Sequence, residues 1–88
     1  MCTYQTTTVA LLGSSGKGSI GWLRLSQASV YFDHPVHAPA EHTLNIDFAN
    51  PELGPAARVA VELTAADARA LVEAIQTALA EAPEELVR

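Results

Sequence analysis

The chain is poor in several residue types, and each shortage argues against a class of protein. Cys2 is its one cysteine, so no disulfide can form within the chain, as is typical of a protein in a reducing compartment. Five basic residues stand against ten acidic ones, which gives a formal net charge of −5. Because phosphate groups repel an acidic chain without a basic patch, we expect neither nucleic acid nor an anionic membrane surface as a partner.

Long hydrophobic runs are also missing from the sequence. No stretch approaches the about 18 apolar residues that a membrane-spanning helix needs. The N-terminal sequence MCTYQTTTVALLGSS lacks the basic segment with which a signal peptide begins. We therefore expect a cytoplasmic protein.

Aromatic side chains are few as well. The 88 residues include two Phe, two Tyr and one Trp, and much of the apolar content is alanine. This length corresponds to a single domain, residues 1–88, with a small core. Because a second copy would add buried surface, we predict a homodimer.

Segments that are β-branched, or that alternate between apolar and polar side chains, predict an antiparallel sheet over residues 1–63. The expected strands are residues 3–12, residues 20–33 as one strand or as two divided by a bulge or bend at 26–27, residues 44–48 and residues 58–63. Residues 13–19, GSSGKGS, look like a phosphate loop, but Lys17 is followed by Gly18 where a nucleotide-binding loop needs serine or threonine. We therefore predict a hairpin turn there, and another turn at NPELGP, residues 50–55.

The C-terminal part of the chain has the pattern of an amphipathic helix. Thr64 followed by Asp67 is a variant of the capping box, and Pro83 ends the pattern. Between them apolar side chains recur at helical spacing: Ala68, Leu71, Val72, Ile75, Leu79 and Ala82. We predict a helix over residues 64–82 whose apolar stripe packs on the core, and a mobile tail over residues 83–88. The fold class is α+β, an antiparallel meander of about four strands with one C-terminal helix packed on one face.

All three histidines lie in one segment, DHPVHAPAEH, residues 33–42. His34 continues the strand face that carries Val30 and Phe32, and His42 continues the face that carries Leu44. A hairpin would therefore hold His34 and His42 at the rim of the core. His37 lies on the connection between them, which two prolines restrict.

Three imidazoles that converge would leave an open position on a metal ion for water or a substrate. We therefore predict a divalent metal site, with zinc or iron as the metal, formed by His34, His37 and His42, with Cys2, Glu41 or Asp33 as the further ligand. Cys2 is explained alternatively as a small buried apolar residue. Glu41 and Asp33 would orient an imidazole or act as the catalytic base. The substrate would be a small organic molecule in a pocket under Trp22 and Phe32.

Other interpretations stay open. The histidines are explained equally by a purely structural role, with His34 at a strand end, His37 in solvent and His42 hydrogen-bonded at the core edge. A protein-interaction module would use the second sheet face, which carries Tyr31, Asn45 and Asp47. A metal-free isomerase or cyclase would move protons between a histidine and a carboxylate.

Three stretches, MCTYQT, DHPVHAPAEHTLNIDF and RVAVELTAADARALVEAI, resemble a family of short uncharacterised bacterial proteins, a domain of unknown function typical of actinobacteria. The resemblance covers nearly the whole chain. It implies that the chain is a complete protein, and it implies no activity.

Overall fold

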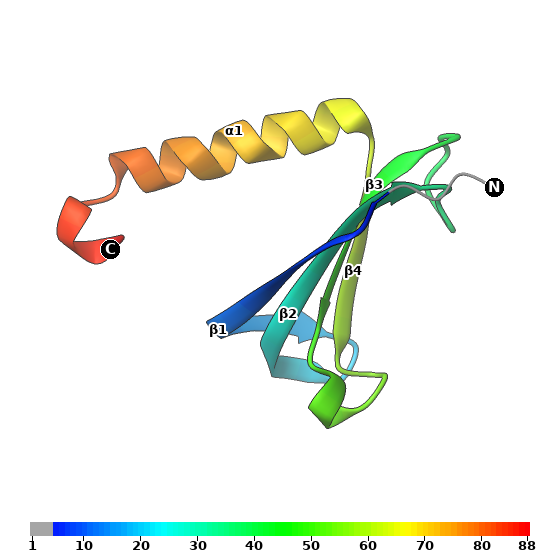
Figure 1. Cartoon of the computed structure of the whole chain (residues 1–88), viewed down its shortest axis with the longest axis horizontal. Helices are drawn as coiled ribbons and strands as arrows, with labels where there is room; N and C mark the ends of the chain where they lie inside the picture. The colour runs from blue at the N-terminus through cyan, green and yellow to red at the C-terminus, as the bar shows by residue number, and fades with distance from the viewer. Residues whose placement is uncertain (1–4) are drawn as a thin grey trace.

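The computed structural model describes residues 5–88, which form a four-stranded sheet and one long helix (Figure 1). The strands run antiparallel in the order β1-β2-β3-β4, so each strand pairs with its neighbour in the sequence. This meander with one C-terminal helix confirms the predicted α+β class. The elements are β1 (Thr7–Gly18), β2 (Gly21–Asp33), β3 (Thr43–Ala49), a 3₁₀ turn η1 (Pro51–Leu53), β4 (Arg58–Leu63), α1 (Ala65–Glu81) and a 3₁₀ turn η2 (Glu84–Leu86).

The first hairpin differs from the prediction. Strand β1 continues through the glycine- and serine-rich residues to Gly18, and the chain turns only at residues 19–20, before Gly21 at φ 102°. Strand β2 is one continuous strand. The irregularity lies in β1, where the register shifts between Ala10 and Ser14, opposite the predicted bend in β2. Composition alone favoured a turn, whereas pairing with β2 keeps this segment extended.

Close packing explains why this segment of β1 contains glycine. A Cβ atom on Gly18 would lie 2.9 Å from the backbone oxygen of Arg58, and one on Gly16 would lie 2.9 Å from Leu25 Cδ1. The glycines therefore let the end of β1 approach β4. The buried core lies next to these two glycines. It consists of Leu23, Leu25 and Ala57, with Leu11 and Phe48 packed against them.

We expect Gly18→Ala to destabilise the protein by about 1–3 kcal/mol, because the new methyl group would collide with backbone that has no room to move. Gly13→Ala is the matched control, since a Cβ atom at Gly13 meets nothing within 4 Å. Urea unfolding of the two variants measures the difference. Equal midpoints for both variants would show that the approach of β1 to β4 is not tight.

The pairing of β2, β3 and β4 gives the sheet two chemically different faces. Val30 is opposite Ile46, and Phe32 is opposite Leu44, so these apolar side chains share one face. The residues between them lie on the other face, which is polar: Tyr31, Asn45 and Asp47 from these two strands, with Arg58 and Glu62 from β4.

Helix α1 begins and ends where the sequence predicts. The Thr64 hydroxyl accepts a hydrogen bond from the Asp67 backbone N–H at 3.1 Å, as the capping pattern requires. The tail that follows the helix is not extended, because η2 closes with a hydrogen bond from Leu86 N to Pro83 O at 2.9 Å. No helix among residues 5–88 is long and apolar enough to cross a membrane.

The packing of α1 differs from the prediction. The helix contacts mainly β3 and β4, and Figure 1 shows it running outward from the end of β4 instead of lying along the strands. The predicted core stripe is therefore exposed, at 43% for Leu71, 53% for Val72, 51% for Ile75 and 56% for Leu79. A single residue, Thr64, joins β4 to α1, and an open cleft lies between the helix and the apolar face of the sheet.

Candidate functional site

The histidine segment joins β2 to β3, and two of its three imidazoles meet. The ring centroids of His34 and His42 are 4.5 Å apart, as their shared strand parity predicted. The His42 ring also stacks on Phe32 at 5.7 Å, with 10° between the ring planes. The pair therefore lies at the rim of the apolar sheet face.

Backbone groups fix the position of His34. The Nδ1 atom of His34 lies 3.1 Å from the backbone oxygen of Glu41. The backbone N–H of His34 donates a hydrogen bond to Asp33 Oδ1 at 2.7 Å. A carbonyl oxygen only accepts, so Nδ1 carries the proton and Nε2 presents its lone pair. The described hydrogen bonds join the Asp33 carboxylate to the backbone N–H of His34 and the backbone oxygen of Glu41 to its ring, so the catalytic roles of the Asp33 and Glu41 carboxylates stay predictions.

The predicted three-histidine metal centre is not assembled in this structure. Across residues 5–88, no group of three or more His, Cys, Asp or Glu side chains is arranged to hold a metal ion. His37 is exposed, and its backbone is held on β4 instead of beside the other two histidines. Cys2, the fourth predicted ligand, lies outside the described residues. The predicted substrate pocket is also absent, because Trp22 pairs with Lys17 at the far end of the first hairpin and is 72% exposed.

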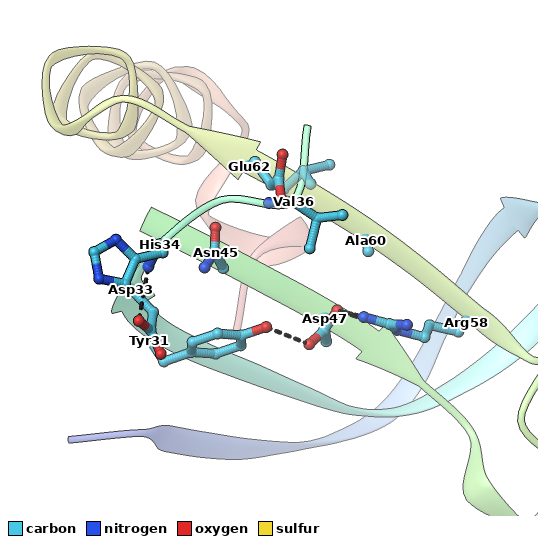
Figure 2. A pocket seen from close by; sticks show the side chains of 10 residues that line it. Tyr31, Asp33, His34, Val36, Asn45, Asp47, Arg58, Ala60 and Glu62 are labelled. Carbon is cyan, nitrogen blue, oxygen red and sulfur yellow. Dashed lines mark hydrogen bonds and ion pairs between the residues drawn. The ribbon is translucent and has the colours of Figure 1, made fainter. Parts of the chain in front are cut away.

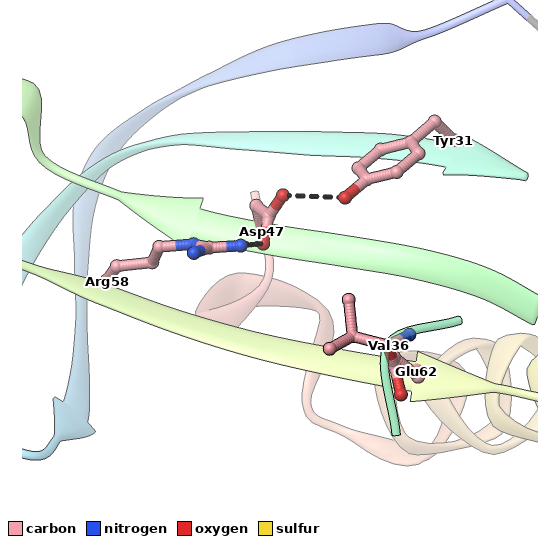
Figure 3. Close-up of polar contacts among 5 residues, drawn as sticks. All are labelled: Tyr31, Val36, Asp47, Arg58 and Glu62. Carbon is pink, nitrogen blue, oxygen red and sulfur yellow. Dashed lines mark hydrogen bonds and ion pairs between the residues drawn. The ribbon is translucent and has the colours of Figure 1, made fainter. Parts of the chain in front are cut away.

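Glu62 anchors the histidine segment on the sheet, as Figure 3 shows for Val36. Its carboxylate accepts backbone N–H hydrogen bonds from Val36, from His37 at 3.0 Å and from Ala38 at 2.9 Å. These donors, those of Val36 and Ala38 foremost, lower the pKa of Glu62. This contact could not be predicted from the sequence, because the donors and the acceptor are far apart along the chain and any residue type except proline can supply a backbone donor.

We expect Glu62→Gln to loosen the segment, because an amide offers one neutral acceptor to three backbone donors. The lowered pKa of Glu62 means that its stabilising effect is present above the pKa of the unfolded chain and is lost as pH falls through the folded value. The urea midpoint of the wild type should therefore exceed that of the variant at pH 7 and approach it below about pH 4.3.

Glu52→Gln is the control, because Glu52 makes no side-chain hydrogen bond among the described residues. A difference between wild type and Glu62→Gln that stays constant from pH 7 to pH 3 would contradict the charged anchor.

The polar face carries a second set of contacts (Figure 3). The Tyr31 hydroxyl donates to Asp47 Oδ2 at 3.1 Å, and Arg58 donates to Asp47 Oδ1 through Nε at 3.1 Å and Nη2 at 2.6 Å. Burial raises the pKa of Tyr31, and the bond to Asp47 raises it further. Arg58 is 54% exposed, so its ion pair contributes no more than about 1 kcal/mol.

A small pocket of about 240 Å³ opens on this face between Tyr31, Asn45, Asp47 and Val36 (Figure 2). Asn45 forms its floor, is 6% exposed, and accepts from the Thr43 hydroxyl at 2.6 Å. The predicted position of Tyr31, Asn45 and Asp47 on the second face is confirmed. The oxygen atoms of their side chains are already hydrogen-bonded, to one another or to Thr43 and Arg58, so this face differs from an apolar docking surface.

The open apolar surface lies on the opposite face. A cleft of about 340 Å³ separates the sheet from α1 and is almost entirely apolar. Its sheet wall consists of Val30, Leu44, Ile46 and Leu63, and its helix wall of Ala68, Arg69, Leu71, Val72 and Ile75. Apolar side chains of α1 that the periodicity predicts to be buried in the core therefore line an open groove.

Comparison with known proteins shows which family the chain belongs to, but it does not indicate a reaction or a ligand. The profile of a family of unknown function, DUF6295, matches residues 1–88. The chain belongs to this family. No curated protein and no solved structure matches it. The DUF6295 assignment confirms the resemblance to an uncharacterised family, and it assigns no role to any residue.

Two surfaces of this DUF6295 chain therefore remain as candidates for function. One is the histidine pair, where the lone pair of His34 Nε2 is available for a ligand or a proton. The other is the apolar cleft with the exposed stripe of α1. The cleft involves more of the chain, and apolar surface of this extent is typical of an interaction site.

Proposed function

We propose that the chain is a non-enzymatic protein-interaction module that receives an amphipathic helix of another chain in the cleft between its sheet and α1. The observation that carries this proposal is the exposure of the whole apolar stripe of α1, 43–56% for its four large side chains. In a helix whose partner is its own sheet, such side chains would be buried.

The chemistry of the cleft indicates what kind of partner fits. Its walls present branched aliphatic side chains, and Arg69 is the one charged residue among them. A groove of this kind binds the apolar face of an amphipathic helix, because the contact needs apolar area and few directed polar groups. Arg69 would then pair with an acidic residue at the edge of the bound helix.

We expect Ile75→Glu to abolish binding in the cleft, because it places a charge among aliphatic side chains. Thr77→Glu is the matched control, since it adds the same charge on the opposite face of α1. Fluorescence of 1-anilinonaphthalene-8-sulfonate and sedimentation velocity on the same samples measure the effect. In the wild type and in Thr77→Glu, we expect the cleft either to bind the dye or to be covered by another chain. In Ile75→Glu, we expect neither dye binding nor association.

The opposite result is a wild type that sediments as a monomer and binds no more dye than Ile75→Glu. That outcome would mean that the cleft is closed in solution, and it would remove the proposed function.

A second candidate function follows from the histidine pair. Hydrogen bonding of Nδ1 to a backbone carbonyl is the usual arrangement of a metal-bound histidine, because it orients the ring and directs Nε2 outward. His34 and His42 would supply two nitrogen ligands to zinc or ferrous iron, with water completing the coordination. Without metal, the alternative role of the same two imidazoles is that of a proton donor and acceptor.

Zinc titration by calorimetry of untagged protein tests this candidate. Losing the orienting partner of a metal-bound histidine costs 10–100-fold in affinity, so losing a ligand through His34→Ala should weaken zinc binding by at least about 100-fold. His37→Ala should leave the affinity unchanged. Equal losses in both variants would restore the three-histidine set, and absence of zinc binding in the wild type would eliminate the site.

We propose in addition that the protein is cytoplasmic, because its single cysteine is typical of a reducing compartment, and that it is actinobacterial, because three stretches resemble the family described above.

A further inference from the structure

We infer that the helix received by the cleft is α1 of a second copy, so that two chains form a two-fold dimer in which each helix arm lies against the sheet of the other. This inference rests on the proposed function and names its partner. Three observations carry it: the excess of exposed surface, the short connection before α1, and the position of Leu79.

The exposed surface exceeds that of a compact monomer. A monomeric chain of 9.3 kDa exposes about 5,000 Å², and this chain exposes 6642 Å². The excess is about 1,600 Å² per chain, within the range that obligate homodimers bury. The radius of gyration agrees, at 14.5 Å against about 12 Å for a compact domain of this length.

The connection before α1 is short, and the cleft beside it is open. Leu63 is the last residue of β4 and Ala65 the first of α1, so Thr64 alone turns the chain. The Thr64 side chain is already committed to capping the helix. No other residue lies between the strand and the helix cap, so the angle between α1 and its own strands is set at Thr64, and this angle leaves the cleft open for a second chain to cover.

The position of Leu79 favours a second copy over a foreign helix. Leu79 continues the stripe beyond the cleft and is 56% exposed. A foreign helix seated in the cleft would leave this distal part of α1 in water. In a two-fold dimer, α1 of each chain enters the cleft of the other chain. The cleft and the distal end of α1 with Leu79 are then covered in both copies. The buried core, limited to Leu23, Leu25, Ala28 and Ala57 among the described apolar residues, explains why the chain needs that cover.

Sedimentation velocity over a range of protein concentrations tests the dimer. We expect the wild type to sediment at twice the chain mass of 9.3 kDa. Leu79→Glu should shift the chain to the monomer and weaken association by at least about 100-fold, because the charge would be buried unpaired at the contact. Leu79 lies outside its own cleft, so this variant keeps the fold, which far-UV circular dichroism checks.

Two control variants locate the contact. Thr77→Glu, on the opposite side of α1, should remain dimeric. Val9→Lys tests the exposed edge strand β1, where Val9 is 51% exposed and strand pairing between copies is the competing arrangement. A dimer lost in Val9→Lys and kept in Leu79→Glu would overturn the inference.

The outcome also separates the two proposals. A monomeric wild type that binds 1-anilinonaphthalene-8-sulfonate, and loses the dye in Ile75→Glu, would overturn the second copy and leave the module open to a foreign helix. A monomer that binds no dye would overturn both.

Discussion

The register between β2 and β3 is the constraint on which the rest of the structure depends. Pairing Phe32 with Leu44 places the aliphatic side chains of both strands on one face and the hydrogen-bonding side chains on the other. Continued by two pairs, past Asp33 and Thr43, the same register brings His34 beside His42. A shift of one residue would exchange the faces, breaking the Tyr31–Asp47 contact and burying carboxylates beneath α1. The separation of a polar face from an apolar cleft therefore has one structural cause.

Much of this could be predicted from the sequence, because it depends on local pattern. Alternation in β3 and β4 and the capping residue Thr64 are visible within a few positions, and they predicted the meander and the helix. The strand parity of His34 and His42 likewise predicted that their rings meet. The predictions that were wrong concern features that depend on contacts between distant parts of the chain. A segment rich in glycine and serine indicates a turn, and only the passage of β1 close to the Arg58 carbonyl shows why Gly18 is needed within a strand.

The candidate site shows the same division. Three imidazoles in ten residues suggested a metal centre, but convergence of side chains depends on how the segment is held, and Glu62 on a distant strand holds it by backbone groups. Likewise, the periodicity of α1 predicted an apolar stripe correctly. It could not tell whether the surface that buries the stripe belongs to the same chain, because periodicity is the same in both cases.

The approach of Gly18 to Arg58 has a consequence for the order of folding. Each hairpin of the meander joins neighbouring segments, so its contacts form with little loss of chain entropy. The contact between the end of β1 and β4 joins the two edge strands and must wait until every hairpin between them has formed. The small core of Leu23, Leu25 and Ala57 is completed only by this closure. Until it forms, the chain is a sheet with both faces in water, which is the state most exposed to aggregation during synthesis.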